Sequence, residues 1–281
     1  MLDKLKKIQY GLKVKWYEAT EEHTRVIDLN GRRVQIMEGG EGEPLLYLHS
    51  AYGENLWLPF HQKLAERFRV IAPAHPGFAE SDGIEEIDSM EDMIFHYLDL
   101  LDYLGQDRIN IAGVSLGGWI AAEFATRYPD RVKRLVLAAS AGLWLADHPM
   151  TDLFAFLRRP LRLREINFHD PNSYLAEMLI PTEADEERMA AAYKAMAATA
   201  RLAWNPPGHN PKLAGRLRRI KSPTLIIWGD DDKLIPTPYA EEWAAHIKDS
   251  RVVKIKDCGH MLMFEGEDDF VAAISDFLGR S

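Results

Sequence analysis

The chain has 281 residues, a formal net charge of −9 at neutral pH and a single cysteine, Cys258. This length suits one large α/β domain with an insertion, or two small domains, and a hydrophobic content of 47% is ordinary for a globular enzyme. The acidic balance argues against nucleic acid as the main partner, because phosphate binding requires a basic face. A lone cysteine excludes a disulfide within these residues.

Residues 1–20 are basic and mixed in character, and they predict either a short arm or a helix over the core. They lack the continuous apolar stretch of a signal peptide, and no later run is long enough to span a bilayer. We therefore expect a cytoplasmic protein. The sequence leaves the oligomeric state open, a homodimer included.

Strands and helices alternate along most of the chain. Residues 24–29 and 32–38 alternate around Asn30-Gly31, which is typical of a β-hairpin. Apolar runs then predict buried strands separated by helices, and this alternation favours a mostly parallel central sheet with helices on both faces. Further strands are expected at 45–49, 69–73, 107–112, 134–139, 224–228 and 251–255, and helices near 57–67, 89–104, 119–128, 211–220, 238–247 and 268–278.

The alternation stops between residues 141 and 210. Aromatic and aliphatic residues recur there at helical spacing, and prolines divide the segment into several short helices. We interpret residues 141–210 as a helical cap (lid) inserted into a core domain of residues 1–140 and 211–281. Apolar side chains in or near this cap suggest a pocket for apolar substrates, although packing inside the cap explains each cap residue equally well. The candidates are Trp144, Phe154, Met178 and Met261.

Residues 113–118 read Gly-Val-Ser-Leu-Gly-Gly and connect a buried strand to a helix. A G-x-S-x-G sequence between strand and helix is typical of a nucleophile elbow, whose tight turn needs glycines on either side of the serine. The pattern predicts that the Ser115 hydroxyl stands at the edge of the sheet. The N–H of Leu116 then begins a helix, where it can stabilise an oxyanion.

A serine hydroxyl becomes a good nucleophile only beside a base, usually a histidine oriented by a carboxylate. In sheets with such an elbow, the chain order is serine, acid, histidine. Acids 230–232 follow one apolar strand and His260 follows the next. A second oxyanion donor is expected in the loop after His49, with the Ala51 N–H as the candidate. His49 itself is expected to bond loops beneath the site.

We expect no cofactor and no metal site. The ten histidines are scattered without metal-binding spacing, and no glycine-rich phosphate loop occurs. Cys258 is interpreted as a small buried hydrophobic residue rather than a reactive thiol.

Together these motifs resemble the α/β-hydrolase superfamily over roughly residues 24–140 and 211–281. In that family the catalytic acid is the third residue after the glycine that ends the strand, which implies Asp232 here, with Asp230 as the fallback. The sequence departs from the family at Ser50, where glycine is usual. The matching segments are residues 48–51, 74–81 (with Ala74 in place of a common Asp), 113–118, 228–236 and 258–260.

The resemblance implies a serine carboxylesterase that cleaves small to medium apolar esters through an acyl-enzyme. Ser115 would attack, His260 would transfer the proton and Asp232 would orient His260. The alternative is a carbon–carbon bond hydrolase of meta-cleavage-type vinylogous diketones with the same three residues, although those enzymes usually carry Trp where Met261 stands. A non-catalytic binding module is a third reading, which the intact Ser-Asp-His set opposes. Dehalogenases and epoxide hydrolases are disfavoured because they use a carboxylate nucleophile.

Overall fold

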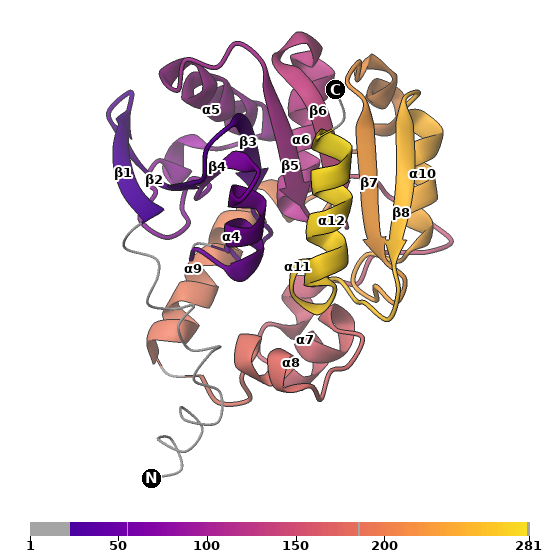
Figure 1. The fold of residues 1–281 in the computed structure, drawn as a ribbon. Coiled ribbons are helices and arrows are strands. Elements are labelled where there is room, and N and C mark those ends of the chain that lie inside the picture. Colours follow the sequence, from indigo (N-terminus) through magenta and orange to yellow (C-terminus); the bar gives the residue numbers. More distant parts are fainter. Residues whose placement is uncertain (1–22, 55, 185, 280–281) are drawn as a thin grey trace.

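A computed structural model describes residues 23–54, 56–184 and 186–279 (Figure 1). The expectation for residues 1–20 lies outside the described residues. The strands form one eight-stranded sheet in the order β1-β2-β4-β3-β5-β6-β7-β8. Their bounds are β1 (Thr24–Leu29), β2 (Arg32–Gly39), β3 (Glu43–Leu48), β4 (Phe68–Pro73), β5 (Ile109–Val114), β6 (Val132–Ala138), β7 (Thr224–Gly229) and β8 (Ser250–Ile255).

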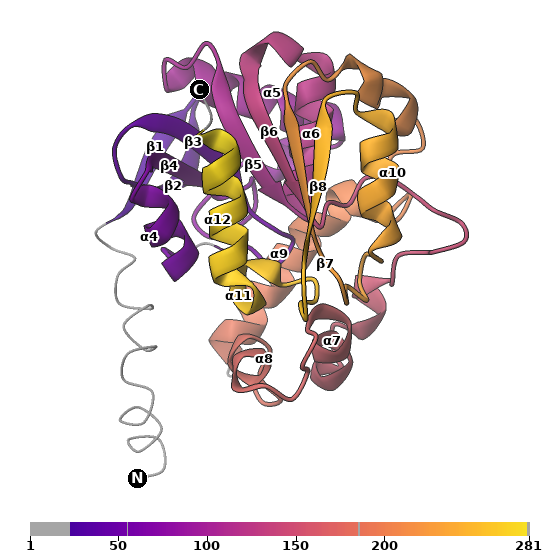
Figure 2. The ribbon, with the colours of Figure 1, turned by 45° about the vertical axis from the view of Figure 1, so that its right-hand side comes forward.

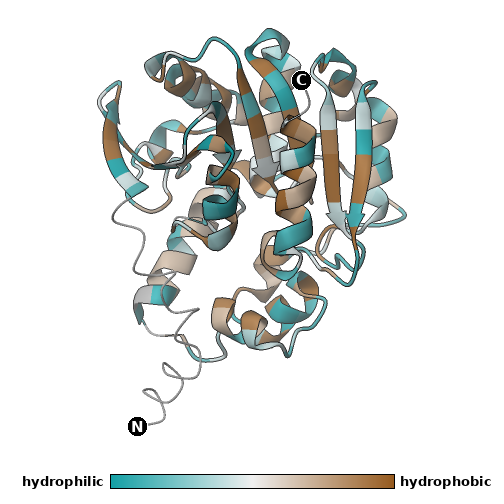
Figure 3. Ribbon diagram, viewed as in Figure 1, coloured by the Kyte–Doolittle hydropathy of each residue, from teal (hydrophilic) through white to brown (hydrophobic). Residues whose placement is uncertain are grey.

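The sheet is parallel from β4 to β8, and only the β1–β2 and β2–β4 pairs are antiparallel. The inner strands β5 and β7 are buried along their whole length, as expected for parallel strands covered on both faces. Figure 3 shows their hydrophobic residues in brown. Asn30 and Gly31, with φ of 56° and 83°, make the tight turn predicted between β1 and β2.

Helices cover both faces of the sheet, which confirms the predicted fold class (Figures 1 and 2). On one face lie α5 (Met90–Tyr103), α6 (Leu116–Arg127) and α10 (Pro238–His246); on the other lie α4 (Pro59–Ala65) and α12 (Glu267–Leu278). A short helix that we did not predict, α11 (Leu262–Glu265), precedes α12. Among the described helices, none is both long and apolar enough to cross a membrane.

Between β6 and β7, the described residues form no strand, as predicted, but the helices differ in detail. They are the 3-10 helix η3 (Leu153–Phe156), α7 (Pro160–Asn167), α8 (Tyr174–Leu179) and α9 (Glu186–Ala203). Pro160, expected to separate helices, occupies the first turn of α7, where its missing N–H costs nothing. The helix expected at 211–220 is the 3-10 helix η4 (Ala214–Arg219).

Helices α7 and α8 lie beyond the carboxyl ends of the parallel strands, at the bottom of Figure 1. Loops that follow β3, β5, β7 and β8 emerge at this same edge, because parallel strands all end there. The division into a core domain and a cap stays a prediction. What the fold provides is a single edge where the candidate residues of four loops can meet.

Candidate active site

Ser115 follows β5 in a sharp turn, with φ of 52° and ψ of −112°. A non-glycine residue in this region is strained, and surrounding bonds must hold it there. The Ser115 N–H donates to the carbonyl of Ala138 at 2.9 Å, and its own carbonyl accepts from Trp119 and Ala141 at 3.1 Å each. Strand β6 and helix α6 therefore hold the turn from both sides.

The glycines of the elbow are required by packing. A Cβ placed on Gly117 would lie 2.1 Å from the carbonyl oxygen of Leu48 in β3. One on Gly113 would lie 2.3 Å from the carbonyl oxygen of Gly117. Both distances are far below van der Waals contact, so helix α6 can approach β3 and β5 only because these positions lack side chains.

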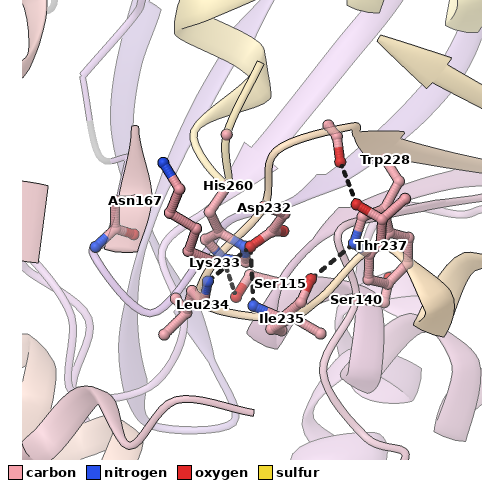
Figure 4. A network of polar contacts seen from close by, with 12 residues as sticks. Ser115, Ser140, Asn167, Trp228, Asp232, Lys233, Leu234, Ile235, Thr237 and His260 are labelled. Atoms are coloured by element: carbon pink, nitrogen blue, oxygen red, sulfur yellow. Dashed lines mark hydrogen bonds and ion pairs between the residues drawn. The ribbon is translucent and has the colours of Figure 1, made fainter. Parts of the chain in front are cut away.

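Ser115, His260 and Asp232 form a continuous hydrogen-bonded chain (Figure 4). The Ser115 Oγ lies 3.0 Å from His260 Nε2, and His260 Nδ1 lies 2.8 Å from Asp232 Oδ2. All three are buried, with exposed fractions of 7%, 1% and 5%. The Leu234 and Ile235 N–H groups donate to Asp232 Oδ1 at 3.0 and 2.8 Å, which fixes the carboxylate. This geometry suits proton transfer from a serine to an oriented imidazole.

The structure distinguishes the three acids of the cluster at 230–232. Asp230 accepts a hydrogen bond from the Cys258 N–H at 3.3 Å. Asp231 pairs with Lys233 at 2.8 Å and with His169 at 3.0 Å. Within the described chain, Asp232 is the member that contacts His260.

Cys258 is buried, as the sequence predicts, and that burial raises the pKa of its thiol well above the usual range. Among the residues that the structure describes, no group of three or more His, Cys, Asp or Glu side chains is arranged to hold a metal ion.

The two backbone N–H groups predicted as oxyanion donors both belong to described residues next to the site. Leu116 begins α6, and Ala51 lies buried in the loop after β3. Neither N–H donates to another described residue. Because α6 directs its N-terminal dipole toward the Ser115 side, negative charge near Ser115 would be stabilised.

His49 links two loops, as predicted. It accepts from the His75 N–H at Nε2 (2.9 Å), and its Nδ1 donates to the Ser50 carbonyl (2.7 Å). Burial lowers the pKa of His49 to about 4, which keeps the ring neutral for this double role.

Two residues around the site, Asn167 and Glu265, were not found by sequence analysis. Asn167, at the end of α7, donates to the Tyr52 hydroxyl at 2.7 Å, and its carbonyl accepts from the Met261 N–H at 3.1 Å. Glu265 accepts from the N–H groups of Gly259 and His169 at 2.8 and 3.0 Å. Single polar residues in helical or loop segments give no pattern by which a sequence could reveal such contacts.

The four predicted substrate-binding residues belong to different segments of the structure. Trp144 is 45% exposed and stacks on His209, while Met178 is half-buried in α8. Met261 is buried beside His260. Phe154 lines an apolar groove of about 490 Å³ between η3 and α9. The other lining residues are Asp152, Ala155, Leu157, Tyr193, Met196, Ala197, Ala200 and Trp204.

Comparison with known proteins agrees with this fold. A model of the Alpha/beta hydrolase family matches residues 45–274. A 2-hydroxy-6-oxononadienedioate/2-hydroxy-6-oxononatrienedioate hydrolase of Pseudomonas putida is 31% identical over 90% of this chain and 93% of its own. A 2-hydroxy-6-oxo-6-phenylhexa-2,4-dienoate hydrolase of Comamonas testosteroni is 28% identical over 89% of this chain and 93% of its own.

Among solved structures, a membrane phospholipase A shares the fold with a TM-score of 0.80 at 24% identity, over 99% of this chain and 95% of its own. The family model covers most of the chain, and the eight-stranded sheet has the matching architecture. The chain belongs to the α/β-hydrolase family.

Proposed function

We propose that this protein is a serine hydrolase that cleaves a carbon–carbon bond in meta-cleavage-type substrates, the 2-hydroxy-6-oxo-dienoates. The observation that carries the hydrolase assignment is the hydrogen-bonded chain from Ser115 through His260 to Asp232. The choice of substrate is supported by the relatives, which are named for hydrolysis of such compounds. Ester hydrolysis, the main expectation from sequence, becomes the second candidate.

In the first step, the Ser115 Oγ attacks the keto carbon of the substrate while His260 Nε2 takes the hydroxyl proton. The N–H groups of Leu116 and Ala51 donate hydrogen bonds to the keto oxygen and stabilise the negative charge that develops on it. Asp232 stabilises the imidazolium and holds its orientation.

In the second step, with the substrate in its 2-keto tautomer (the proton of the 2-hydroxyl having moved to the carbon beside the 6-keto carbon), the carbon–carbon bond breaks and its electron pair passes into the conjugated 2-keto group. The dienolate that leaves takes the proton from His260 and departs as the 2-hydroxy-dienoate product. The acyl group stays on Ser115 as an ester. His260 then deprotonates a water that attacks this ester, and Ser115 recovers its proton as the acid product leaves.

One observation favours the second candidate, hydrolysis of apolar carboxylic esters. The groove between η3 and α9 is lined by apolar side chains and a single charged one, the acidic Asp152. The carboxylate of a dienoate would not be stabilised by apolar side chains beside an acidic one. An uncharged ester would bury its apolar groups there favourably. Ester hydrolysis would follow the same steps as carbon–carbon bond hydrolysis, except that the leaving group is an alkoxide rather than a dienolate.

The test compares both substrates with purified wild type and Ser115→Ala. We expect wild type to bleach a coloured 2-hydroxy-6-oxo-dienoate, with kcat/KM exceeding that for p-nitrophenyl butyrate by about 100-fold or more. Ser115→Ala should lose about 10³-fold or more on either substrate. Turnover of the ester alone would select the second candidate. Equal rates for wild type and variant would reject the mechanism.

A further inference from the structure

The loop that carries the second oxyanion donor contains a buried acid that the mechanism above does not use. Glu54 is 7% exposed, and in the described part of the chain it has no ion-pair partner. Its side-chain bonds go to one residue: the Ser50 N–H donates to Oε2 at 2.7 Å, and the Ser50 hydroxyl lies 2.5 Å from Oε1. A buried carboxyl directed at a single neighbour indicates a specific local role.

These bonds organise the loop residue by residue. The Ser50 Oγ accepts from the Tyr52 N–H at 3.1 Å, and the Ser50 carbonyl accepts from the Gly53 N–H at 3.1 Å. The N–H groups of residues 50, 52 and 53 are thus occupied. The N–H of Ala51, between them, donates to no described residue.

The loop also explains the departure of the sequence from its family. Glycine is usual at position 50, and here the serine side chain bridges Glu54 and the Tyr52 N–H. The bridge lets a residue with a side chain hold the tight loop that glycine ordinarily permits.

The charged and titratable groups that face Glu54 are His260, Tyr47 and Tyr52. Burial raises the pKa of Glu54, and the hydrogen bonds from Ser50 and the attraction of His260 oppose this rise. Burial, with the nearby Glu54 carboxyl, also raises the pKa of both tyrosines well above the usual range. An amide of the same size can keep both contacts with Ser50, because its oxygen accepts from the Ser50 N–H and its NH2 group donates to the Ser50 hydroxyl oxygen, so glutamine should replace Glu54.

We propose that Glu54 is a positioning residue that, through Ser50, fixes the loop after β3 so that the Ala51 N–H faces the oxyanion formed at Ser115. This inference rests on the proposed serine chemistry, but on neither of its two substrate classes. Loss of Glu54 would release Ser50 and let the Ala51 N–H turn away, which weakens stabilisation of the transition state more than binding of the ground state.

The experiment measures the second-order rate constant with which an alkyl fluorophosphonate inactivates the enzyme, since this probe reacts with an activated serine whatever the natural substrate. We expect Glu54→Ala to react about 10- to 100-fold more slowly than wild type, and Glu54→Gln within about threefold of it. Glu242→Ala, on the far helix α10, serves as control and should react as wild type does. With p-nitrophenyl acetate, Glu54→Ala should lower kcat and leave KM within about threefold.

Thermal melting accompanies each variant, because a merely structural acid would lower the melting temperature without changing the rate per titrated serine. If Glu54→Ala does not fold, Ser50→Ala takes its place with an expected loss of about three- to tenfold, while Glu54→Gln still reacts normally. Inactivation of folded Glu54→Ala or Ser50→Ala at the wild-type rate would overturn this inference alone, as would a Glu54→Gln variant as slow as Glu54→Ala. Failure of wild type to react would overturn the serine chemistry, and this inference with it.

Discussion

The candidate site is bounded by two regions that are held in different ways. Ser115 and Asp232 each follow a buried strand, His260 follows the edge strand β8, and the sheet fixes where these strands end. The segment between β6 and β7 instead consists of helices, from the four-residue η3 to the 18-residue α9, whose positions depend on their contacts. The sheet edge is therefore specified locally along the chain, whereas the helical segment is specified by what it packs against. The following predictions test this difference, beginning with the largest expected effect.

The sharpest test at the sheet edge uses two neighbouring acids. Asp232→Asn keeps the shape of the side chain but removes the charge that orients His260, so we expect kcat to fall about 10³- to 10⁴-fold. Asp230→Asn is the matched control, because Asp230 contacts the Cys258 N–H rather than His260. Turnover of the preferred substrate measures both variants. Similar losses would show that the acid cluster acts by its total charge.

Two glycine-to-alanine substitutions compare a tightly packed glycine at the sheet edge with an open glycine between β6 and β7. Gly117→Ala would force a Cβ to 2.1 Å from the Leu48 carbonyl, whereas at Gly215 in η4 no atom lies within 4 Å of the added Cβ. We expect Gly117→Ala to reduce the free energy of unfolding by about 3 kcal/mol or more. Gly215→Ala should change it by less than about 1 kcal/mol. Urea unfolding measures both, and equal effects would contradict the close approach of α6 to β3.

The free energy of unfolding should depend on pH through buried histidines, of which His96 on helix α5 is the test case. Both ring nitrogens of His96 lack a hydrogen-bond partner among the described residues, and burial lowers its pKa to about 3. Below about pH 6.5 the imidazole of His96 binds a proton in the unfolded chain but stays neutral in the folded chain. The free energy of unfolding therefore falls as the pH falls toward 3.

His96→Leu should remove about 1.4 kcal/mol per pH unit from this slope. The free energy of unfolding at pH 7.5, 6 and 5 measures it. Parallel curves for wild type and variant would show that His96 is already charged in the folded protein.

The smallest effect is expected in the helical segment. Trp204 is 65% exposed and contacts Phe154 at the edge of the apolar groove. If the groove receives part of the substrate, Trp204→Ala should raise KM about three- to tenfold, with kcat changed less than about threefold. Phe95→Ala, an exposed aromatic on α5, is the control. An unchanged KM would remove the groove from substrate binding.

Sequence reasoning located the residues at the sheet edge because strand, turn and order leave a clear pattern. Buried strands have continuous apolar runs, and the elbow requires glycine at fixed positions, so Ser115 and its partners could be named before the structure. The third acid of the cluster was chosen by family resemblance, and the structure places it against His260.

The helical segment was predicted only as helical. Its residues contact solvent, the core and neighbouring loops by turns. The hydrophobic periodicity therefore predicted neither the start of α7 nor that residues of η3 form a 3-10 helix. Contacts such as Asn167 to Tyr52 join residues far apart in the chain, and a buried acid such as Glu54 resembles any loop glutamate. The cap boundaries and the cytoplasmic location stay predictions.

The bond from the Met261 N–H to the Asn167 carbonyl has a consequence for engineering. A shortened chain that joined β6 directly to β7 would keep every strand, but it would lack Asn167. The turn that carries His260 would then lose the hydrogen bond from the Met261 N–H to that residue. Trimming the protein to a minimal scaffold should therefore disorganise the proton-transfer partner of Ser115, and the helices between β6 and β7 cannot be exchanged freely as an interchangeable module.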